Sequence, residues 1–392
     1  MKKSRIFFAL CFLFSFAQEI FAVRTGFSCF SEIVSIDLPE GFYTKDSSSD
    51  GKSYLLGCDF STSNAAIRIY DAKRFSTAKE ALDSSMKNLK VNFESEEFFW
   101  YSKASAFSVF DGNIGGIYSR GMSAATVVPE NSSVIFIMLW TSAENFENEY
   151  PLFASFFDGL YVDMQSYFSK GILTSYLDSE EMENLESGTE EKIDVNLEID
   201  GHQIKTNLFA KDSTFAQEFI EREYQVLCLY QKDSRWKEAW QRFYRLIFRD
   251  SCARLKKASF DIYNALAPYC ADETDFAQKL LNWVQEFNYE RESTQSDFAN
   301  LPSMLLGGGS DCDSRSLLLA VLLNEVNIDS CIFVSAEYSH AVAGLVSSHP
   351  GFSFEAEEKN YLIGETTAKN LNWGNISKDQ ADRSKWIEVL LP

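Results

Sequence analysis

The chain has 392 residues, a formal net charge of −21 and a hydrophobic share of 45%. Its length suits two or three domains of ordinary size, and its apolar content is sufficient for packed cores. So acidic a protein is not expected to bind nucleic acid, because such binding depends on Lys and Arg displacing counterions from phosphates.

The first 22 residues have the layout of a secretory signal peptide. Lys2 and Arg5 precede an apolar run at residues 6–16, and Ala22 closes the segment. That run is far shorter than the ~20 apolar residues needed to span a bilayer. We therefore expect cleavage at about Ala22, a secreted or periplasmic location, and no stable membrane insertion.

Eight cysteines occur in the chain, and all but Cys11 lie beyond the signal peptide. The remaining number is odd, so at least one thiol is expected to be unpaired in an exported protein. A bridge between Cys29 and Cys58 is one option. Spacing alone does not establish disulfide geometry, and it leaves the connectivity open.

Residues 23–177 are expected to form an N-terminal α+β domain. Apolar periodicity predicts strands at 34–38, 66–70 and 134–140 and helices at 76–89 and 143–160. Ser76 is expected to cap the first helix. This order of elements and the motif Leu38-Pro39-Glu40-Gly41-Phe42 resemble the Mog1/PsbP-like fold. No nucleophile is paired with a base in this part, so an accessory or binding role is expected.

Residues 178–194 are interpreted as an acidic linker, because eight acidic residues stand there against the single Lys192. Beyond it, alternation on both sides of Asp200-Gly201 predicts a β-hairpin over residues 193–208. Helical periodicity then runs from Ser213 to Ala267. Residues 195–271 are therefore expected to form a hairpin and a helical lobe.

The second helix of this lobe carries an aromatic stripe that includes Trp236, Trp240 and Phe243. Asp233 or Ser234 is expected to cap it. Arginines interleave with the stripe, and we expect them to project outward into solvent from a helix whose aromatic face is buried. A nucleic-acid patch is the less favoured interpretation because the whole protein is acidic.

A candidate nucleophile follows an amphipathic helix at 275–289, which Asp272 is expected to begin. A glycine loop that ends in Gly309 leads through Asp311 to Cys312 and then directly into an apolar helix. Cys312 is thereby placed in the first helical turn, where the helix dipole favours a thiolate. Asp311 and Asp313 are interpreted as turn or cap residues, because a carboxylate beside the nucleophile would raise its pKa.

A thiol nucleophile needs a base and a group that orients the base. His340 opens one predicted strand, whereas the other two histidines, His202 and His349, lie beside predicted turns or loops. Glu365 ends another predicted strand, at 361–364. A helix with Cys, a strand with His and a strand with an acid would bring three side chains to one sheet edge.

Three blocks of residues 272–392 resemble bacterial transglutaminase-like domains. The blocks are Gly309-Ser310-Asp311-Cys312-Asp313-Ser314-Arg315-Ser316, Tyr338-Ser339-His340-Ala341 and Tyr361-Leu362-Ile363-Gly364-Glu365-Thr366-Thr367. The resemblance implies a papain/transglutaminase-like fold with Cys312, His340 and Glu365 as the catalytic set. It also implies that Trp283 or Tyr289 supplies an oxyanion donor, with Gly309 and Asp311 supporting the loop.

The sequence departs from the family at two positions. Glu365 replaces the more usual Asp, and Val342 stands where a Trp often follows the His. A glutamate is chemically adequate to orient an imidazole, but without the Trp the family's substrate subsites do not carry over to this chain.

The expected function is thiol-dependent acyl transfer on a protein or peptide substrate, without a cofactor or a metal. Water as acceptor would make the enzyme a cysteine protease or amidase, and an amine would make it a transglutaminase. The alternative is a catalytically inactive papain-like fold that serves as an envelope binding or scaffolding protein. Zinc binding is disfavoured because the chain has no Cys-x-x-Cys motif.

Overall fold

A computed structural model of the chain describes residues 24–26, 35–71, 73–128, 133–183, 191–290 and 296–391. The predicted signal peptide and the possible partner of Cys58, Cys29, lie outside these residues. Within the described ranges, no helix has both the length and the apolar character needed to cross a membrane.

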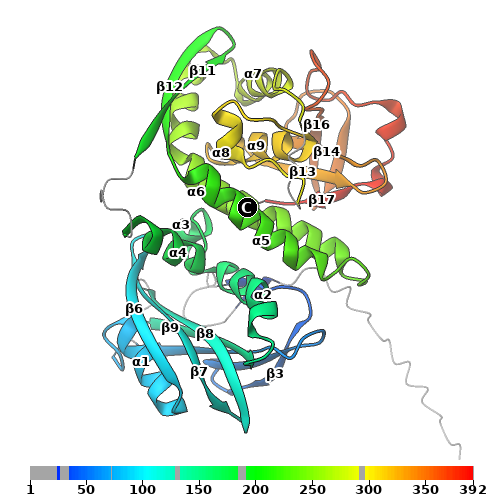
Figure 1. Cartoon of the computed structure of the whole chain (residues 1–392). Coiled ribbons are helices and arrows are strands. Elements are labelled where there is room, and N and C mark those ends of the chain that lie inside the picture. The colour runs from blue at the N-terminus through cyan, green and yellow to red at the C-terminus, as the bar shows by residue number, and fades with distance from the viewer. Residues whose placement is uncertain are drawn as a thin grey trace, which may run out of the picture.

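The N-terminal part is built on a seven-stranded antiparallel sheet with the order β3-β4-β5-β9-β8-β7-β6 (Figure 1). Its strands are β3 (Phe42–Ser47), β4 (Ser53–Cys58), β5 (Asn64–Asp71), β6 (Asn92–Trp100), β7 (Lys103–Ile114), β8 (Ile117–Val128) and β9 (Ser133–Ser142). A second, small sheet joins β1 (Arg24–Gly26), β2 (Ser35–Asp37) and β10 (Leu160–Tyr161). The predicted α+β class is confirmed, because the strand pairings are antiparallel and the helices lie in separate segments.

Helices cover both faces of the seven-stranded sheet. Helix α1 (Ala78–Leu89) packs on one face, while α2 (Phe146–Asp158) and α4 (Ile172–Glu183) contribute to the apolar cluster on the other. Burial on both faces explains why β9 is a continuous apolar run. The short helix α3 (Met164–Tyr167) precedes α4. The predicted cap of α1 was one residue early: Thr77, not Ser76, accepts the backbone N–H of Glu80.

The predicted acidic linker at 178–194 is wrong at both ends. Helix α4 continues to Glu183, and strand β11 (Lys192–Ile199) begins before the predicted boundary. The carboxylate of Asp178 is mostly buried, 2.6 Å from Lys170 Nζ and 3.3 Å from Arg254 Nη1. A run of acidic residues was therefore taken for solvated chain although its first member closes a buried ion cluster.

The predicted hairpin is confirmed. Strand β11 pairs along its whole length with β12 (His202–Phe209). Asp200 and Gly201 both have positive φ, at 51° and 77°, as the two central residues of a type I′ turn require. The apolar face of the hairpin joins the largest core cluster, to which α6 also contributes.

Two long helices lie between the N-terminal sheet and the C-terminal part: α5 (Asp212–Cys228) and α6 (Trp236–Leu266) (Figure 1). Helix α6 begins after Arg235, and no side-chain hydrogen bond caps it. Asp233 instead binds the backbone N–H and the guanidinium of Arg235. The prediction of Asp233 or Ser234 as the cap was wrong for this reason.

The expectation that the arginines of α6 project into solvent was also wrong. Arg242, Arg245 and Arg249 are buried against the N-terminal part. Arg242 donates to the backbone oxygen of Ser155, and Arg245 makes a bidentate pair with Asp37 at 2.7 and 2.8 Å. Arg249 donates to four backbone carbonyls, at the end of α2, in β10 and at the end of α3. Helix α6 thus has a second buried face, which the aromatic stripe did not reveal.

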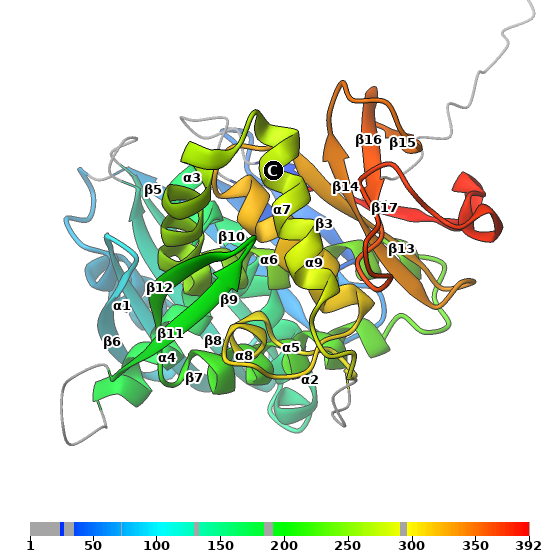
Figure 2. The same ribbon diagram turned by 90° about the horizontal axis from the view of Figure 1, so that it is seen from above.

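The C-terminal part combines three helices with a five-stranded sheet in the order β15-β16-β14-β13-β17 (Figure 2). The helices are α7 (Glu273–Gln285), α8 (Leu301–Leu305) and α9 (Cys312–Asn324). The strands are β13 (Ser330–Ser335), β14 (His340–Val346), β15 (Ser353–Ala356), β16 (Lys359–Gly364) and β17 (Ile387–Val389). Short 3-10 turns lie at Ala267–Tyr269, Lys378–Gln380 and Arg383–Lys385.

Helix α9 is the centre of this part. Every residue from Leu317 to Leu323 is buried, and the helix contacts β13 and β14 on one side and α6 and α7 on others. An apolar run without an amphipathic pattern is typical of a helix enclosed on all sides. The N-terminus of α9 is therefore held rigidly beside the start of β14.

Candidate functional site: a cysteine, a histidine and a glutamate

Cys312 is the first residue of α9. Asp311 is its N-cap, and the side chain of Asp311 accepts the backbone N–H of Ser314 at 2.9 Å. The Ser314 hydroxyl in turn lies 2.9 Å from the backbone nitrogen of Asp311, which completes a capping box. The predicted cap role of Asp311 is confirmed, and the cap fixes where the Cys312 side chain leaves the helix.

The surroundings of the thiol oppose its ionisation. Cys312 is only 3% exposed, and its Sγ lies 3.4 Å from Oδ1 of Asp313. Burial, followed by the charges of Asp313 and Asp311, raises the pKa of the Cys312 thiol far above its ordinary value. The backbone N–H of Ala341 acts in the opposite direction. The sequence-based expectation of a thiolate favoured by the helix terminus is therefore not met in the resting protein.

His340 and Glu365 come together as the order of strands predicted. His340 opens β14, Glu365 directly follows β16, and these two strands pair in the sheet. Nε2 of His340 lies 2.8 Å from Oε2 of Glu365. Thr367 donates its backbone N–H and its hydroxyl to the other carboxylate oxygen, at 2.8 and 2.6 Å.

The surroundings of Glu365 stabilise its charged form. Burial alone would raise the pKa of Glu365, but the hydrogen bond and charge of His340 and the bonds from Thr367 hold that pKa below its ordinary value. An ionised Glu365 accepts a hydrogen bond from Nε2–H, and in a neutral imidazole this arrangement leaves the lone pair on Nδ1. Within the described residues, Nδ1 of His340 has no hydrogen-bond partner.

The third residue lies beside the pair. The N–H of Ala341, the residue that follows His340, faces the sulfur of Cys312. The charge of His340 also acts on Asp313, the immediate neighbour of Cys312. The structure thus pairs His340 with Glu365 and places the Cys312 sulfur against the backbone N–H of Ala341, but no hydrogen bond joins Cys312 to the His340 imidazole among the described residues.

The glycine loop before Cys312 packs closely against the segment that contains Tyr289 and Glu290. The backbones of Tyr289 and Ser310 form a parallel bridge, and a Cβ added at Gly309 would lie 2.6 Å from Cβ of Glu290. Glycine is therefore required at 309 for two chain segments to approach each other. Tyr289 is 54% exposed, and the guanidinium carbon of Arg315 lies 5.6 Å from the centre of its ring.

Trp283, the other predicted oxyanion donor, lies on α7 with its ring edge against Phe287. It lines a hollow together with Asp200 and Lys279. No hydrogen bond joins Trp283 to Cys312 or His340 within the described part of the chain. Its position therefore provides no support for an oxyanion role.

Sequence reasoning missed two residues that hold the site together. Arg315, 1% exposed, donates to Ser310 Oγ and to the carbonyls of Phe287 and Thr366. It ties the Cys312 loop to the strand end that carries Glu365. A single arginine in an apolar helix, three residues after the nucleophile, was a signal that could have identified it.

Tyr244 is the second missed residue. Its hydroxyl donates to Asp313 Oδ2 at 2.7 Å and links α6 to the first turn of α9. Tyr244 precedes Asp313 by 69 positions, so no local pattern could connect the two residues.

No protein family matches the chain, and no curated protein matches it. Among solved structures, a cyanobacterial PsbP protein from Synechocystis sp. PCC 6803 has 13% identity and a TM-score of 0.28, covering 33% of this chain and 86% of its own. The Ran-binding protein Mog1p of Saccharomyces cerevisiae has 11% identity and a TM-score of 0.26, covering 34% and 92%.

A protein from Bacteroides thetaiotaomicron has 11% identity and a TM-score of 0.25, with 57% of this chain and 75% of that chain covered. These likenesses are distant and concern the fold alone.

Proposed function

We propose that this protein is a thiol-dependent acyl-transfer enzyme of the transglutaminase-like kind, with Cys312 as nucleophile, His340 as base and Glu365 as the acid that orients the base. The single observation that carries the proposal is the 2.8 Å contact of His340 Nε2 with Glu365, next to Ala341, whose backbone N–H bonds the Cys312 sulfur. The contact leaves Nδ1 of His340 as the proton acceptor.

The raised pKa of Cys312 decides how such a reaction would begin. A resting thiol must lose its proton as it attacks, so the proton passes from Sγ to Nδ1 of His340 while the S–C bond forms at a carbonyl. His340 then gives this proton to the departing amine as the C–N bond breaks. The resulting thioester is opened by water, or by a second amine, which regenerates the thiol.

The acceptor and the substrate remain those expected from the sequence: a protein or peptide, with water or an amine as acceptor. A second candidate is the inactive papain-like fold that binds a partner. The 3% exposure of Cys312 and the carboxylates of Asp311 and Asp313 favour that candidate, because they suppress the thiolate.

The two candidates differ in whether His340 controls the reactivity of Cys312. Peptide mass spectrometry after iodoacetamide treatment at pH 7 measures the alkylation rate of Cys312 separately from that of Cys228, which is only half-buried and lies outside the site. For the enzyme, His340→Gln should lower the Cys312 rate by about 10²-fold and leave Cys228 unchanged, since the base is lost. An equal Cys312 rate in both proteins would exclude the enzymatic proposal.

A further inference from the structure

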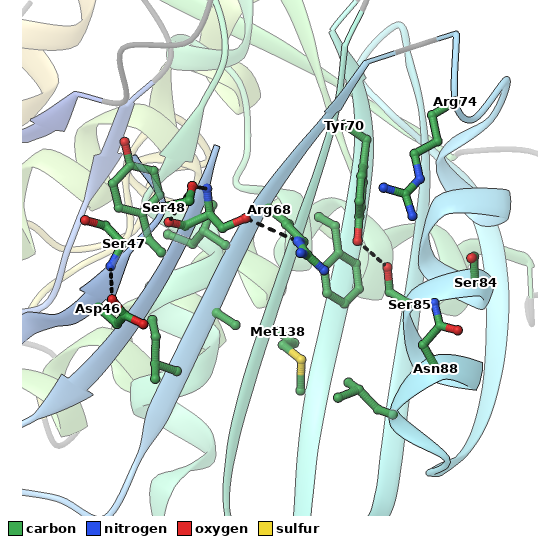
Figure 3. A pocket seen from close by; sticks show the side chains of 17 residues that line it. Asp46, Ser47, Ser48, Arg68, Tyr70, Arg74, Ser84, Ser85, Asn88 and Met138 are labelled. Carbon is green, nitrogen blue, oxygen red and sulfur yellow. Dashed lines mark hydrogen bonds between the residues drawn. The ribbon is translucent and has the colours of Figure 1, made fainter. Parts of the chain in front are cut away.

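The seven-stranded sheet bears a cavity far along the chain from the thiol site. Helix α1 packs on β6, β7, β8 and β9, and the sheet continues beyond β9 through β5 and β4 to β3. A cavity of about 460 Å³ opens here, lined by residues of α1, β3, β4, β5 and β9 (Figure 3). This volume is within the range of small-molecule sites in proteins.

Two arginines line the cavity. Arg68 lies on β5 and Arg74 just after it, with their guanidinium carbons 5.9 and 5.1 Å from the centre of the Tyr70 ring. The two side chains flank that ring in Figure 3. Arg68 donates one hydrogen bond, to Ser53 Oγ at 3.2 Å. Neither guanidinium has a carboxylate partner within ion-pair distance among the residues that the structure describes.

This lack of a partner sets the two arginines apart. Each of the other arginine side chains that the structure describes has an ion pair or binds backbone carbonyls: Arg120, Arg222, Arg235, Arg242, Arg245, Arg249, Arg254, Arg315 and Arg383. In a chain with a net charge of −21, carboxylates are abundant. Arg68 and Arg74 are exposed to solvent at the mouth of the cavity, on either side of the Tyr70 ring, so their guanidinium groups are accessible to an external anion.

The rest of the cavity is suited to an apolar body. Phe136 and Met138 of β9 are buried beneath it, and Leu55 and Leu89 stand partly exposed at its edges. The Tyr70 hydroxyl lies 2.9 Å from Ser85 Oγ, so the ring between the arginines is fixed to α1. An anionic head at the arginines would leave the apolar body of a ligand against these side chains.

The cavity also favours one class of anion. Asp46 lines the end that lies away from Arg74 (Figure 3). Its charge, together with the acidity of the whole chain, disfavours a dianion such as a phosphate monoester. A carboxylate carries a single charge and matches the bidentate geometry of a guanidinium.

We propose that this cavity is a binding site for a small organic carboxylate with an apolar body, whose head group is held by Arg68 and Arg74 beside Tyr70 and whose body lies on Phe136 and Met138. The site belongs to the N-terminal part and does not depend on the proposed activity of Cys312. It assigns a specific ligand class to the part of the chain in which no nucleophile is paired with a base.

Isothermal titration calorimetry of the full protein with 2-naphthoate tests this proposal, with 2-naphthalenemethanol as the neutral isostere and acetate as the head group alone. We expect saturable binding of 2-naphthoate, and a dissociation constant that is about 10-fold higher for the alcohol, because it cannot make charge-assisted bonds. Acetate should bind too weakly to be measured. Each of R68Q and R74Q should raise the 2-naphthoate constant by about 10-fold.

Two further variants control for non-specific effects. R120Q removes the same charge on β8, where Arg120 pairs with Glu147 of α2, and should leave the constant unchanged. S84W places a large ring at the cavity wall on α1 and should abolish binding while the melting temperature stays within a few degrees of the natural protein. Absence of binding at millimolar 2-naphthoate, equal binding of the alcohol, or unaltered constants in R68Q and R74Q would overturn the proposal.

Discussion

At the scale of single residues, two opposing effects act on the Cys312 sulfur. The helix N-terminus stabilises a nearby anion by about 0.3–1 kcal/mol. Removing a charge from water costs several kcal/mol even after the protein relaxes, and Asp313 adds a like charge 3.4 Å away. Burial and repulsion therefore win, and the protonated thiol is the resting form.

Substitution of Asp313 tests this balance. Burial and the charge of Asp311 raise the pKa of Asp313 to about 6, so this carboxyl is mostly ionised at pH 8. Asp313→Asn should lower the Cys312 pKa and increase the alkylation rate of Cys312 at pH 8 by about 10-fold, since one charged neighbour is removed. Below pH 5 the Asp313 carboxyl of the natural protein is protonated and therefore as neutral as the amide that replaces it, so the difference should vanish. A pH-independent ratio of the two rates would show that charge is not the cause.

The sequence was informative about these residues where the chemistry is local. The cap role of Asp311 and the position of Cys312 in the first turn both follow from residues adjacent in the sequence, and the structure confirms them. The high pKa of the thiol depends on burial, which comes from α6 and the sheet. Reasoning from the helix dipole alone could therefore not have found it.

At the scale of elements, α6 is the helix that joins the two halves. Arg245 and Asp37 form a buried bidentate pair between α6 and β2. Arg245→Met should lower the free energy of unfolding by about 3–5 kcal/mol, because Asp37 keeps its charge in a buried place. Urea unfolding measures this loss.

The same helix provides the control for that prediction. Lys257 pairs with Asp261 on an exposed face, so Lys257→Met should change stability by less than about 0.5 kcal/mol. Combining Asp37→Asn with Arg245→Met should cost less than the sum of the two single losses. A loss below 1 kcal/mol for Arg245→Met alone would mean that the pair is dispensable.

Most element types could be predicted from periodicity. The continuous run of β9, the Asp200-Gly201 hairpin and the Asp272 cap of α7 all carry local signals that the structure confirms. The burial of Arg245 could not be predicted, because its partner lies more than 200 positions earlier in the chain. The α4 segment was misjudged for the same reason, since Asp178 is paired with a distant arginine.

At the scale of the whole molecule, the contact between the N-terminal part and the long helices includes Glu40, a carboxylic acid whose pKa is shifted. Burial raises the pKa of Glu40 to about 7, although the charge of Arg242 partly opposes the rise. Tyr230, in the segment between α5 and α6, donates a hydrogen bond from its hydroxyl to the backbone carbonyl of Glu40. The ionisation of one carboxyl is thus coupled to the association of the two parts.

The sign of this coupling follows from the two pKa values of Glu40. The folded protein holds the proton more tightly than the unfolded chain does, so stability falls as pH rises from about 4.5 to about 7. Glu40→Gln should add about 3 kcal/mol to the free energy of unfolding at pH 8 and nothing at pH 4. Urea unfolding at both pH values measures the difference, and Glu97→Gln on the exposed part of β6 is the control. Equal gains at the two pH values would contradict the coupling.

The division into independent domains stays a prediction. The structure shows which contacts a separate C-terminal fragment would lose. A fragment that begins near Gly201 would retain α6 but lose the N-terminal partners of Arg242, Arg245 and Arg249. Those guanidinium groups would then face solvent beside a stripe of apolar surface. We therefore expect the fragment to be less stable than the same segment in the full chain.

The most direct measurement for the central claim is the trapping of an acyl group on Cys312. After brief treatment with p-nitrophenyl acetate, acid quenching and peptide mass spectrometry, the acetyl group should be found on Cys312 as a thioester. The adduct should be absent in Cys312→Ala, reduced by about 10²-fold or more in His340→Ala, and reduced by about 10- to 10⁴-fold in Glu365→Gln, which keeps the nucleophile but loosens the imidazole. An acetyl group confined to other residues, or equal labelling of Cys312 in the natural protein and His340→Ala, would contradict the assignment of this site.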